Sequence, residues 1–299
     1  MTATQIQANG IPIAVEDTHP ADAARPAILL IMGLGGQLIH WPPVFVRPLV
    51  DAGFRVIRMD NRDAGLSRHF SECGKPNLFW TGVRLALGIK PRLPYTLSDM
   101  AQDAIGVLDA LGIQRAHVAG ASMGGMIAQR VALAAPGRVI TLSSIMSSSG
   151  ARGLPGPDPK VLKAMFKKPR GTDPEALARY CVDFFRAVGS PAHPQSPADL
   201  RAMVDASLAR DSDPHASLRQ MVAVLADTGR AALLQRIQCP TLVLHGVHDA
   251  FVPMACGQDT ARRIPGARFV AIDGMGHDLA AGVCAQLLPH LIAFLQTHA

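Results

Sequence analysis

Apolar runs of strand length alternate with helical patterns along most of this 299-residue chain. The run at 27–32 is continuously apolar, as expected of a strand that is covered on both faces. Further strand-like runs lie at 54–59, 115–119, 138–145, 241–245 and 268–272, and helical patterns lie at 43–52, 98–111, 126–134, 254–263 and 280–297. This order predicts an α/β fold with a mostly parallel sheet flanked by helices.

Two segments near the start of the chain depart from this alternation. Residues 3–8 and 11–16 surround Asn9-Gly10, which is a hairpin signal. Residues 69–94 are rich in Gly and Pro, and we interpret them as a loop with a short helix near 79–88. We expect Ser98 to cap the helix that follows this loop.

The composition changes at about residue 147 and the alternation stops. Serine, glycine and proline dominate residues 147–159, and helical patterns without a convincing strand follow at 158–168, 173–188, 197–209 and 214–229. Strands resume only at 241–245. The sequence therefore predicts a core domain formed by residues 1–146 and 237–299, with a helical cap inserted at residues 147–236.

The distribution of charges and cysteines argues against a nucleic-acid-binding, a zinc-binding and a disulfide-rich protein. The net charge is +6, from 29 basic and 23 acidic residues, but the basic residues are scattered, which favours a solvated surface over nucleic-acid binding. The five cysteines form no CxxC pair, which predicts neither a zinc site nor a disulfide framework. The N-terminus lacks a signal-peptide pattern and the apolar runs are too short to span a membrane. We therefore expect a cytoplasmic protein of unspecified oligomeric state.

The segment Gly120-Ala121-Ser122-Met123-Gly124 carries the main candidate for chemistry. It joins the predicted strand at 115–119 to the predicted helix at 126–134. A serine flanked by small residues on a strand-to-helix turn is the nucleophile-elbow pattern. The bare string also occurs by chance, but its position between a strand and a helix favours Ser122 as a nucleophile over a structural turn.

A serine hydroxyl needs a base within hydrogen-bond reach and an acid that orients the base. In a parallel sheet, such groups gather at the carboxyl ends of the strands. His277 follows the last predicted strand in a loop with two glycines, and Asp249 lies a few residues past the strand at 241–245. We predict a Ser122, His277 and Asp249 triad; His248 is the weaker rival for the base.

An oxyanion hole requires two hydrogen-bond donors beside the serine. The backbone amide of Met123 is the expected first donor, and the amide of Leu34, in the loop Gly33-Leu34-Gly35-Gly36, is the expected second donor. The glycine spacing in this loop does not match a nucleotide-binding motif. We also expect Gly33 and Gly35 to contact substrate.

These residues together resemble the α/β-hydrolase superfamily, and within it the bacterial esterases related to aclacinomycin methylesterase. The motifs that carry the resemblance are Gly33-Leu34-Gly35-Gly36, Asp60-x-Arg62-x-x-Gly65-x-Ser67, Gly120-x-Ser122-x-Gly124, His245-Gly246-x-x-Asp249-x-x-Val252-Pro253 and Gly274-Met275-Gly276-His277. The resemblance implies that Asp60, Arg62 and Ser67 brace a loop near the site. Many relatives have His-Gly where this chain has Met32-Gly33, a change that leaves a backbone donor intact.

The resulting hypothesis is a serine hydrolase that cleaves carboxylic esters through an acyl-enzyme, with no metal and no organic cofactor. The partner is then a small, apolar ester. Apolar residues expected to line its pocket are Met32, Leu34, Trp41, Met123, Val252 and Met275. A carbon–carbon bond hydrolase, a cofactor-free peroxidase and a non-catalytic ligand receptor remain alternatives on the same fold. A serine at the elbow disfavours haloalkane dehalogenases and epoxide hydrolases, whose relatives use aspartate there.

Overall fold

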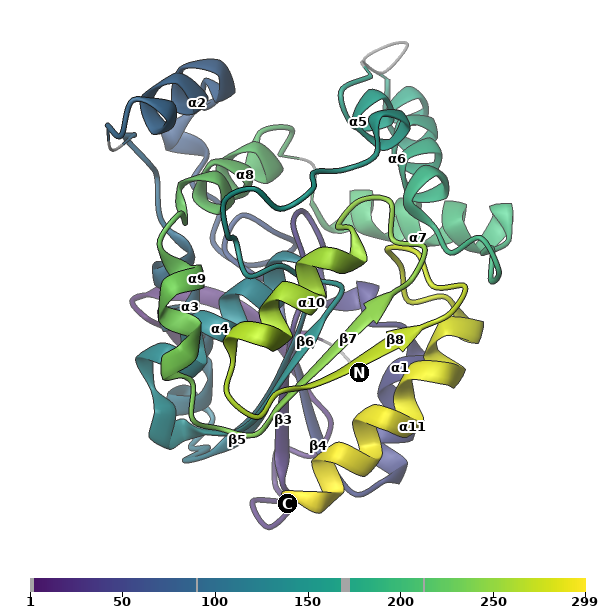
Figure 1. The fold of residues 1–299 in the computed structure, drawn as a ribbon. Coiled ribbons are helices and arrows are strands. Elements are labelled where there is room, and N and C mark those ends of the chain that lie inside the picture. Colours follow the sequence, from purple (N-terminus) through teal and green to yellow (C-terminus); the bar gives the residue numbers. More distant parts are fainter. Residues whose placement is uncertain (1–2, 90, 168–172, 212) are drawn as a thin grey trace.

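The computed structural model describes residues 3–89, 91–167, 173–211 and 213–299. A single mixed sheet forms the centre of the molecule (Figure 1). The strand order in the sheet is β1-β2-β4-β3-β5-β6-β7-β8. β2 pairs antiparallel with both β1 and β4. The other neighbours in this order, β4-β3-β5-β6-β7-β8, pair parallel. The strands are β1 (Thr4–Ala8), β2 (Ile11–Asp17), β3 (Ala27–Ile31), β4 (Arg55–Met59), β5 (Ala116–Ala121), β6 (Val139–Ile145), β7 (Thr241–Gly246) and β8 (Arg268–Ile272). The predicted α/β fold and the N-terminal hairpin are both confirmed.

Helices cover both faces of the sheet and divide its core in two. In β3, Leu29 and Ile31 belong to one apolar cluster, with α3 (Leu97–Ala110) and α4 (Met123–Ala134). Ile28 and Leu30 belong to the opposite cluster, with α1 (Pro43–Asp51) and α11 (Ala281–Thr297). Alternate side chains of a strand point to opposite faces, so a strand buried on both sides must be apolar throughout.

The remaining helices lie mostly at one end of the sheet (Figure 1). Between β6 and β7 the chain forms α5 (Pro159–Met165), α6 (Pro174–Val188), α7 (Pro197–Arg210), α8 (Ala216–Ala226) and α9 (Arg230–Leu233). Elsewhere lie α2 (Leu78–Ala86) and α10 (Met254–Arg263), and short 3₁₀ turns occur at Leu38–His40, Ser71–Cys73, Pro136–Arg138 and Leu234–Arg236. Within the described residues, none of these helices combines the length and apolarity needed to cross a bilayer.

Local helix boundaries differ from the sequence prediction at two places. The cap of α3 is Thr96, not Ser98, because the Thr96 side chain accepts the Asp99 amide while the Asp99 carboxylate accepts the Thr96 amide. The helix expected at 214–229 ends at Ala226, and α9 is a separate short helix. The expected end of the first helix in this region, residue 168, lies outside the described residues.

Buried charged contacts attach α7 and α8 to the core. Arg219 on α8 forms an ion pair of 2.7 Å with Asp63, and both side chains are at most 1% exposed. Asp63 also accepts the Tyr95 hydroxyl at 2.7 Å. Arg210 at the end of α7 contacts the fully buried carboxylate of Asp60 at 2.5 Å. Buried charges are tolerated only when they are paired, so these contacts hold the helices in one position.

Replacement of Gly124 by alanine tests the close approach of α4 to the sheet. A Cβ atom at Gly124 would lie 1.9 Å from the Ile31 carbonyl oxygen, which backbone cannot accommodate without moving. We expect Gly124→Ala to lower the free energy of unfolding by about 3 kcal/mol. Gly137→Ala is the control, since its Cβ would meet nothing within 4 Å and should change stability by less than about 0.5 kcal/mol. Urea denaturation measures both; equal stabilities would contradict the packing argument.

Replacement of Arg219 by methionine tests the buried ion pair. The variant leaves the buried Asp63 carboxylate without its cation. We therefore expect a loss of about 3–5 kcal/mol in the free energy of unfolding. Arg201→Met is the matched control, because Arg201 pairs with Glu175 on the surface, where such a pair contributes at most about 1 kcal/mol. The comparison fails if thermal unfolding shifts equally in the two variants.

Candidate active site

Ser122 stands on a strained turn between β5 and α4. Its φ is 56° and its ψ is −123°, a conformation that non-glycine residues rarely adopt. A Cβ atom at Gly120 would lie 2.0 Å from the Gly124 carbonyl oxygen, so only glycine allows the chain to turn back this closely. The Ser122 amide donates to the Ile145 carbonyl at 2.9 Å, which ties the turn to β6. The turn exposes the hydroxyl above the carboxyl end of the sheet.

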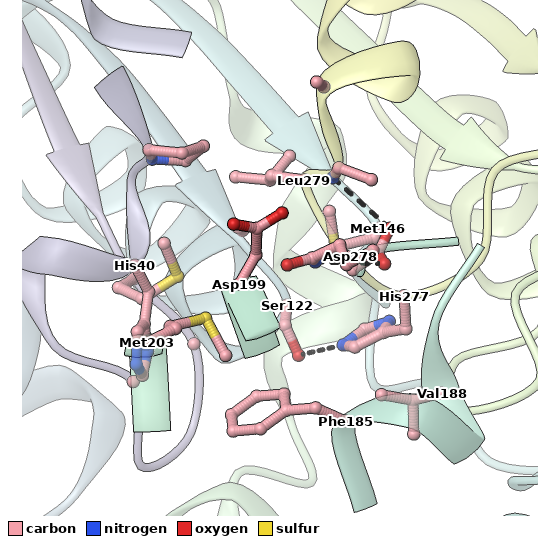
Figure 2. A pocket seen from close by; sticks show the side chains of 18 of the residues that line it. His40, Ser122, Met146, Phe185, Val188, Asp199, Met203, His277, Asp278 and Leu279 are labelled. Atoms are coloured by element: carbon pink, nitrogen blue, oxygen red, sulfur yellow. Dashed lines mark hydrogen bonds between the residues drawn. The ribbon is translucent and has the colours of Figure 1, made fainter. Parts of the chain in front are cut away.

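His277 lies beside Ser122 with one ring nitrogen facing the hydroxyl (Figure 2). Its Nε2 is 3.0 Å from Ser122 Oγ, and its Nδ1 is 2.7 Å from Asp249 Oδ2. A carboxylate only accepts hydrogen bonds, so the proton of the neutral ring belongs on Nδ1 and the Nε2 lone pair faces the serine. The His277 amide donates to the Val188 carbonyl at 2.8 Å, which links this loop to α6.

Asp249 is held by the loop that follows β7. Its Oδ1 accepts the Phe251 and Val252 amides at 2.9 and 2.8 Å, and the residue is 5% exposed. Its second oxygen is left to His277. Backbone donors of this kind stabilise the charged form of a carboxylate and fix its orientation. The structure thus brings the three residues of the predicted triad into one hydrogen-bonded line.

The loop Gly33–Gly36 lies directly against the elbow. A Cβ atom at Gly33 would be 2.9 Å from Ser122 Cβ, so the backbone itself approaches the serine. The Gly36 amide donates to the Gly33 carbonyl at 3.0 Å, closing a tight turn. The Gly35 amide donates to Gln220 Oε1 at 2.7 Å.

Gln220 connects this loop to α8 and had no sequence signal of function. The side chain is fully buried, and its Nε2 donates to the Arg62 carbonyl at 2.8 Å. One amide group therefore holds the Gly35 backbone on one side and the segment after β4 on the other. A buried amide with both ends bonded has one stable orientation, so Gln220 fixes the glycine loop beside Ser122.

The segment after β4 makes a second set of internal contacts. Ser67 Oγ donates to the Asp60 carbonyl at 2.7 Å, and Arg62 pairs with Asp103 at 2.6 Å. Asp60 accepts the Leu38 amide at 2.6 Å, and burial raises the pKa of its carboxyl. These residues contact backbone and one another, in keeping with the bracing position that the resemblance implied.

A cavity of about 900 Å³ opens above Ser122 (Figure 2). Its walls come from the glycine loop, the start of α1, α6, α7 and the loops after β7 and β8. Phe251 packs edge-on against His277 at 5.0 Å, and Phe184 packs edge-on against Phe251 at 5.8 Å. The lining is predominantly apolar: Met32, Leu34, Ile39, Val44, Met146, Phe184, Phe185, Val188, Met203, Phe251 and Leu279 all contribute to it.

Eight of the described lining residues are polar or charged: His40, Ser122, His193, Gln195, Ser196, Asp199, His277 and Asp278. Most of them are already engaged in hydrogen bonds; the Asp199 carboxylate, for example, accepts the Ser196 hydroxyl at 2.8 Å. His40 Nε2 lies 2.7 Å from Ser207 Oγ, and burial, assisted by nearby Arg210, lowers the His40 pKa to about 4. The ring is therefore neutral at pH 7. Asp278, next to His277, accepts the Ser190 amide at 3.2 Å. Such a cavity favours an apolar ligand over a charged one.

The lining differs from the sequence prediction in part. Gly33 and Gly35 are part of the cavity lining, but the described lining does not include Trp41 or Val252. Trp41 is fully buried in the core, where it packs on Phe45 at 4.7 Å, and the Val252 carbonyl accepts His245 Nε2 at 2.7 Å. Met123 and Met275 are likewise core residues and not part of the lining.

Within the described residues, one group of side chains has the composition and spacing of potential metal ligands. Atoms of Asp63, His69 and Asp213 lie within 4.8 Å of one another. Arg219, however, donates to both carboxylates, at 2.7 Å to Asp63 and 2.6 Å to Asp213. The guanidinium thus occupies the position of a cation and balances the two negative charges.

Comparisons with known proteins identify the family and support the fold. A model of the alpha/beta hydrolase fold family matches residues 26–280. Rhodomycin D methylesterase DnrP of Streptomyces peucetius is 32% identical over 293 residues, covering 89% of this chain and 91% of that protein. "Putative carbamate hydrolase RutD" of Variovorax paradoxus (strain S110) is 28% identical over 297 residues, covering 95% and 96%.

A solved structure extends the likeness in fold over almost the whole chain. The crystal structure of a hydrolase from Pseudomonas aeruginosa PA01 has a TM-score of 0.68 at 24% identity and covers 99% of this chain and 98% of its own. At this level of identity, the likeness supports a shared fold and says nothing about function. With the family match over most of the sequence and the methylesterase relative over nearly all of it, the chain belongs to the alpha/beta hydrolase fold family.

Proposed function

We propose that this protein hydrolyses carboxylic esters of apolar compounds, with Ser122 as nucleophile, His277 as general base and acid, and Asp249 as the residue that orients the base. The observation that carries the proposal is the line from Asp249 through His277 to Ser122, at 2.7 and 3.0 Å, at the bottom of an apolar cavity. The relatives named as methylesterases support ester cleavage as the reaction.

In the first half of the reaction, Ser122 Oγ attacks the ester carbonyl carbon while its proton passes to His277 Nε2. Asp249 stabilises the imidazolium that forms. The tetrahedral intermediate collapses when His277 returns the proton to the leaving alcohol oxygen, which leaves the acyl group on Ser122. In the second half, His277 takes a proton from water, the hydroxide attacks the acyl carbon, and the acid departs as Ser122 recovers its proton.

The oxyanion of each tetrahedral intermediate would be stabilised by the amides of Met123 and Leu34. Met123 is the first residue of α4, where backbone amides lack intrahelical acceptors and point out of the helix N-terminus. In the glycine loop, the Gly35 and Gly36 amides are already engaged, which supports Leu34 as the second donor. None of these steps calls for a metal or an organic cofactor.

The helices α5–α9 would act as the cap that selects the substrate. α6 and α7 supply Phe184, Phe185 and Met203 to the cavity that Ser122 also lines. We propose that the apolar part of the ester lies against these side chains. Because a relative carries the name of a carbamate hydrolase, carbamates are the second substrate class to include in a screen.

Ser122→Ala tests the nucleophile. With no hydroxyl to acylate, we expect hydrolysis of p-nitrophenyl esters to fall by at least about 10⁴-fold, and labelling by a fluorophosphonate to disappear. Ser98→Ala, on the exposed surface of α3, is the control and should behave as the wild type. Retained turnover in Ser122→Ala would refute the assignment. Labelling of the wild type without ester turnover would leave the nucleophile intact but point to another acyl substrate.

Gln220→Leu tests whether the cap residue positions the oxyanion loop. Leucine cannot accept the Gly35 amide, so the loop loses its fixed place beside Ser122. We expect kcat to fall by about 10- to 100-fold with little change in KM, because the contact of the proposed Leu34 amide with the oxyanion, which depends on the loop position, forms only in the transition state. Gln235→Leu, at an exposed position, should leave both constants unchanged. The proposal fails if KM rises while kcat stays constant. It also fails if the variant loses the same factor of affinity for the substrate and for a transition-state analogue, since Gln220 would then only maintain the fold.

A further inference from the structure

Helix α2 presents an apolar face to solvent, away from the catalytic cavity. Phe79 is 70% exposed, Trp80 60% and Leu87, which follows the helix, 69%. The neighbouring Ile89 is 47% exposed. Phe79 and Trp80 pack edge-on at 5.4 Å and so form one aromatic surface. A contiguous group of exposed large apolar side chains on a protein surface marks an interaction site.

The structure holds this helix in place by its opposite side. Thr81 is buried, and its hydroxyl donates to the Asn77 carbonyl at 2.9 Å. Asn77 caps the helix by accepting the Trp80 amide at 3.1 Å. The helix packs against α8 and projects from the end of the molecule that carries α5–α8 (Figure 1). Its aromatic face is thus displayed from a fixed support.

The charged side chains of the segment that carries this face, between Glu72 and Asp99, have one sign. Between Glu72 and Asp99 the sequence holds four cationic side chains and no acidic one. Arg84 lies on the helix itself and is exposed, as is Arg92 beyond it. Within the part of the chain that the structure describes, no carboxylate lies within ion-pair distance of Lys75, Arg84 or Arg92. These cations are therefore available to an anionic partner.

A similar arrangement recurs on α5, at the same end of the molecule (Figure 1). Phe166, directly after this helix, is 61% exposed. Lys160 and Lys163 on the helix are both exposed, whereas Lys167, which follows Phe166, is paired with Asp183 at 3.5 Å. Two elements that are distant in sequence thus display aromatic side chains among cations on one end of the protein.

We propose that this end of the protein, with α2 as its principal contact, binds peripherally to the surface of a membrane that contains anionic lipid. Trp and Phe side chains favour the boundary between headgroups and acyl chains, and each nearby Lys or Arg adds attraction to anionic headgroups. A second copy of the chain fits less well. A symmetric contact through α2 would place Arg84 and its neighbours opposite the same cations of the other copy.

The surface and the catalytic cavity are separate. Among the described residues, none of the cavity lining lies between Val44 and Ala121, the interval that contains α2. Membrane binding would hold the carboxyl end of the sheet, where Ser122 lies, near the phase in which apolar compounds dissolve. The membrane proposal does not rest on ester hydrolysis, and substitutions in α2 should leave turnover of a short, water-dispersed ester unchanged.

Co-sedimentation with vesicles tests the proposal. We expect the protein to bind vesicles of equal parts phosphatidylcholine and phosphatidylglycerol, and to bind pure phosphatidylcholine at least about tenfold more weakly. Phe79→Ser with Trp80→Ser, and separately Arg84→Glu, should each weaken binding to the anionic vesicles by about tenfold or more. Arg268→Glu is the matched charge control. It lies exposed at the start of β8, at the opposite end of the parallel strands, and should bind as the wild type.

Tryptophan fluorescence locates the contact. The chain has 2 tryptophans, and Trp41 is fully buried, so Trp80 is the one that a bilayer can reach. Anionic vesicles should shift the emission to shorter wavelength, and lipids brominated on their acyl chains should quench it. Trp80→Phe retains an aromatic side chain and should bind vesicles while losing both spectral changes.

The proposal is overturned if the wild type does not bind anionic vesicles, or if the α2 variants and Arg268→Glu bind them equally. It is also overturned if sedimentation velocity shows self-association that the Phe79 and Trp80 replacements abolish while vesicles have no effect. Unchanged hydrolysis of the short ester shows that each variant is folded, and circular dichroism provides the same check without relying on activity.

Discussion

The close backbone contact between β5, α4 and the end of β3 is the constraint on which the rest of the site depends. Gly120 touches the Gly124 backbone, and Gly124 in turn rests on the Ile31 carbonyl. No side chain fits at either position. The chain can turn this sharply only with Ser122 in a left-handed conformation, which lifts its hydroxyl out of the sheet. The strain at the serine is offset by the packing that surrounds it.

The same contact determines what lies next to the serine. Because α4 sits so close to β3, the loop that leaves β3 must pass beside the elbow, and Gly33 allows it to do so at van der Waals distance. That loop is then held from the outside by Gln220 on α8. Arg219, the preceding residue, is paired with Asp63, so the position of α8 is set by a buried charge. The position of the glycine loop beside Ser122 therefore depends on the position of α8.

The kind of ligand that the cavity favours depends on which of its polar groups already have hydrogen-bond partners. Asp249 is bonded by two amides and His277, and His40 is neutral because burial lowers its pKa. Besides the Ser122 hydroxyl and the amides next to it, the lining carries the exposed carboxylate of Asp199, which accepts the Ser196 hydroxyl. An apolar compound with a single ester group matches this distribution, since its carbonyl meets the donors and the remainder meets phenylalanine and methionine side chains.

The sequence alone determined the fold class and the residues of the hydrogen-bonded line, for physical reasons that act locally. Continuous apolar runs are the mark of strands buried on both faces, and the carboxyl ends of such strands must converge, which placed Asp249 and His277 near Ser122. Motif spacing was sufficient there because each residue lies within a few positions of a strand end. The start of α3 was less well predicted, since Thr96 and Ser98 have similar capping chemistry and only the backbone geometry distinguishes them.

Only the tertiary structure decided the rest. Trp41 looked like a pocket residue but is core, because the turn at Leu38–His40 directs it between helices. Phe184, Phe185 and Met203 line the cavity because α6 and α7 fold back over the sheet, a placement that no local pattern encodes. Gln220 is 185 residues from Gly35 in sequence, and the two meet only because α8 lies against the core, where Arg219 pairs with Asp63. The position of each strand along the chain can be predicted from short stretches of sequence, whereas the position of helices over a site depends on long-range contacts between many side chains.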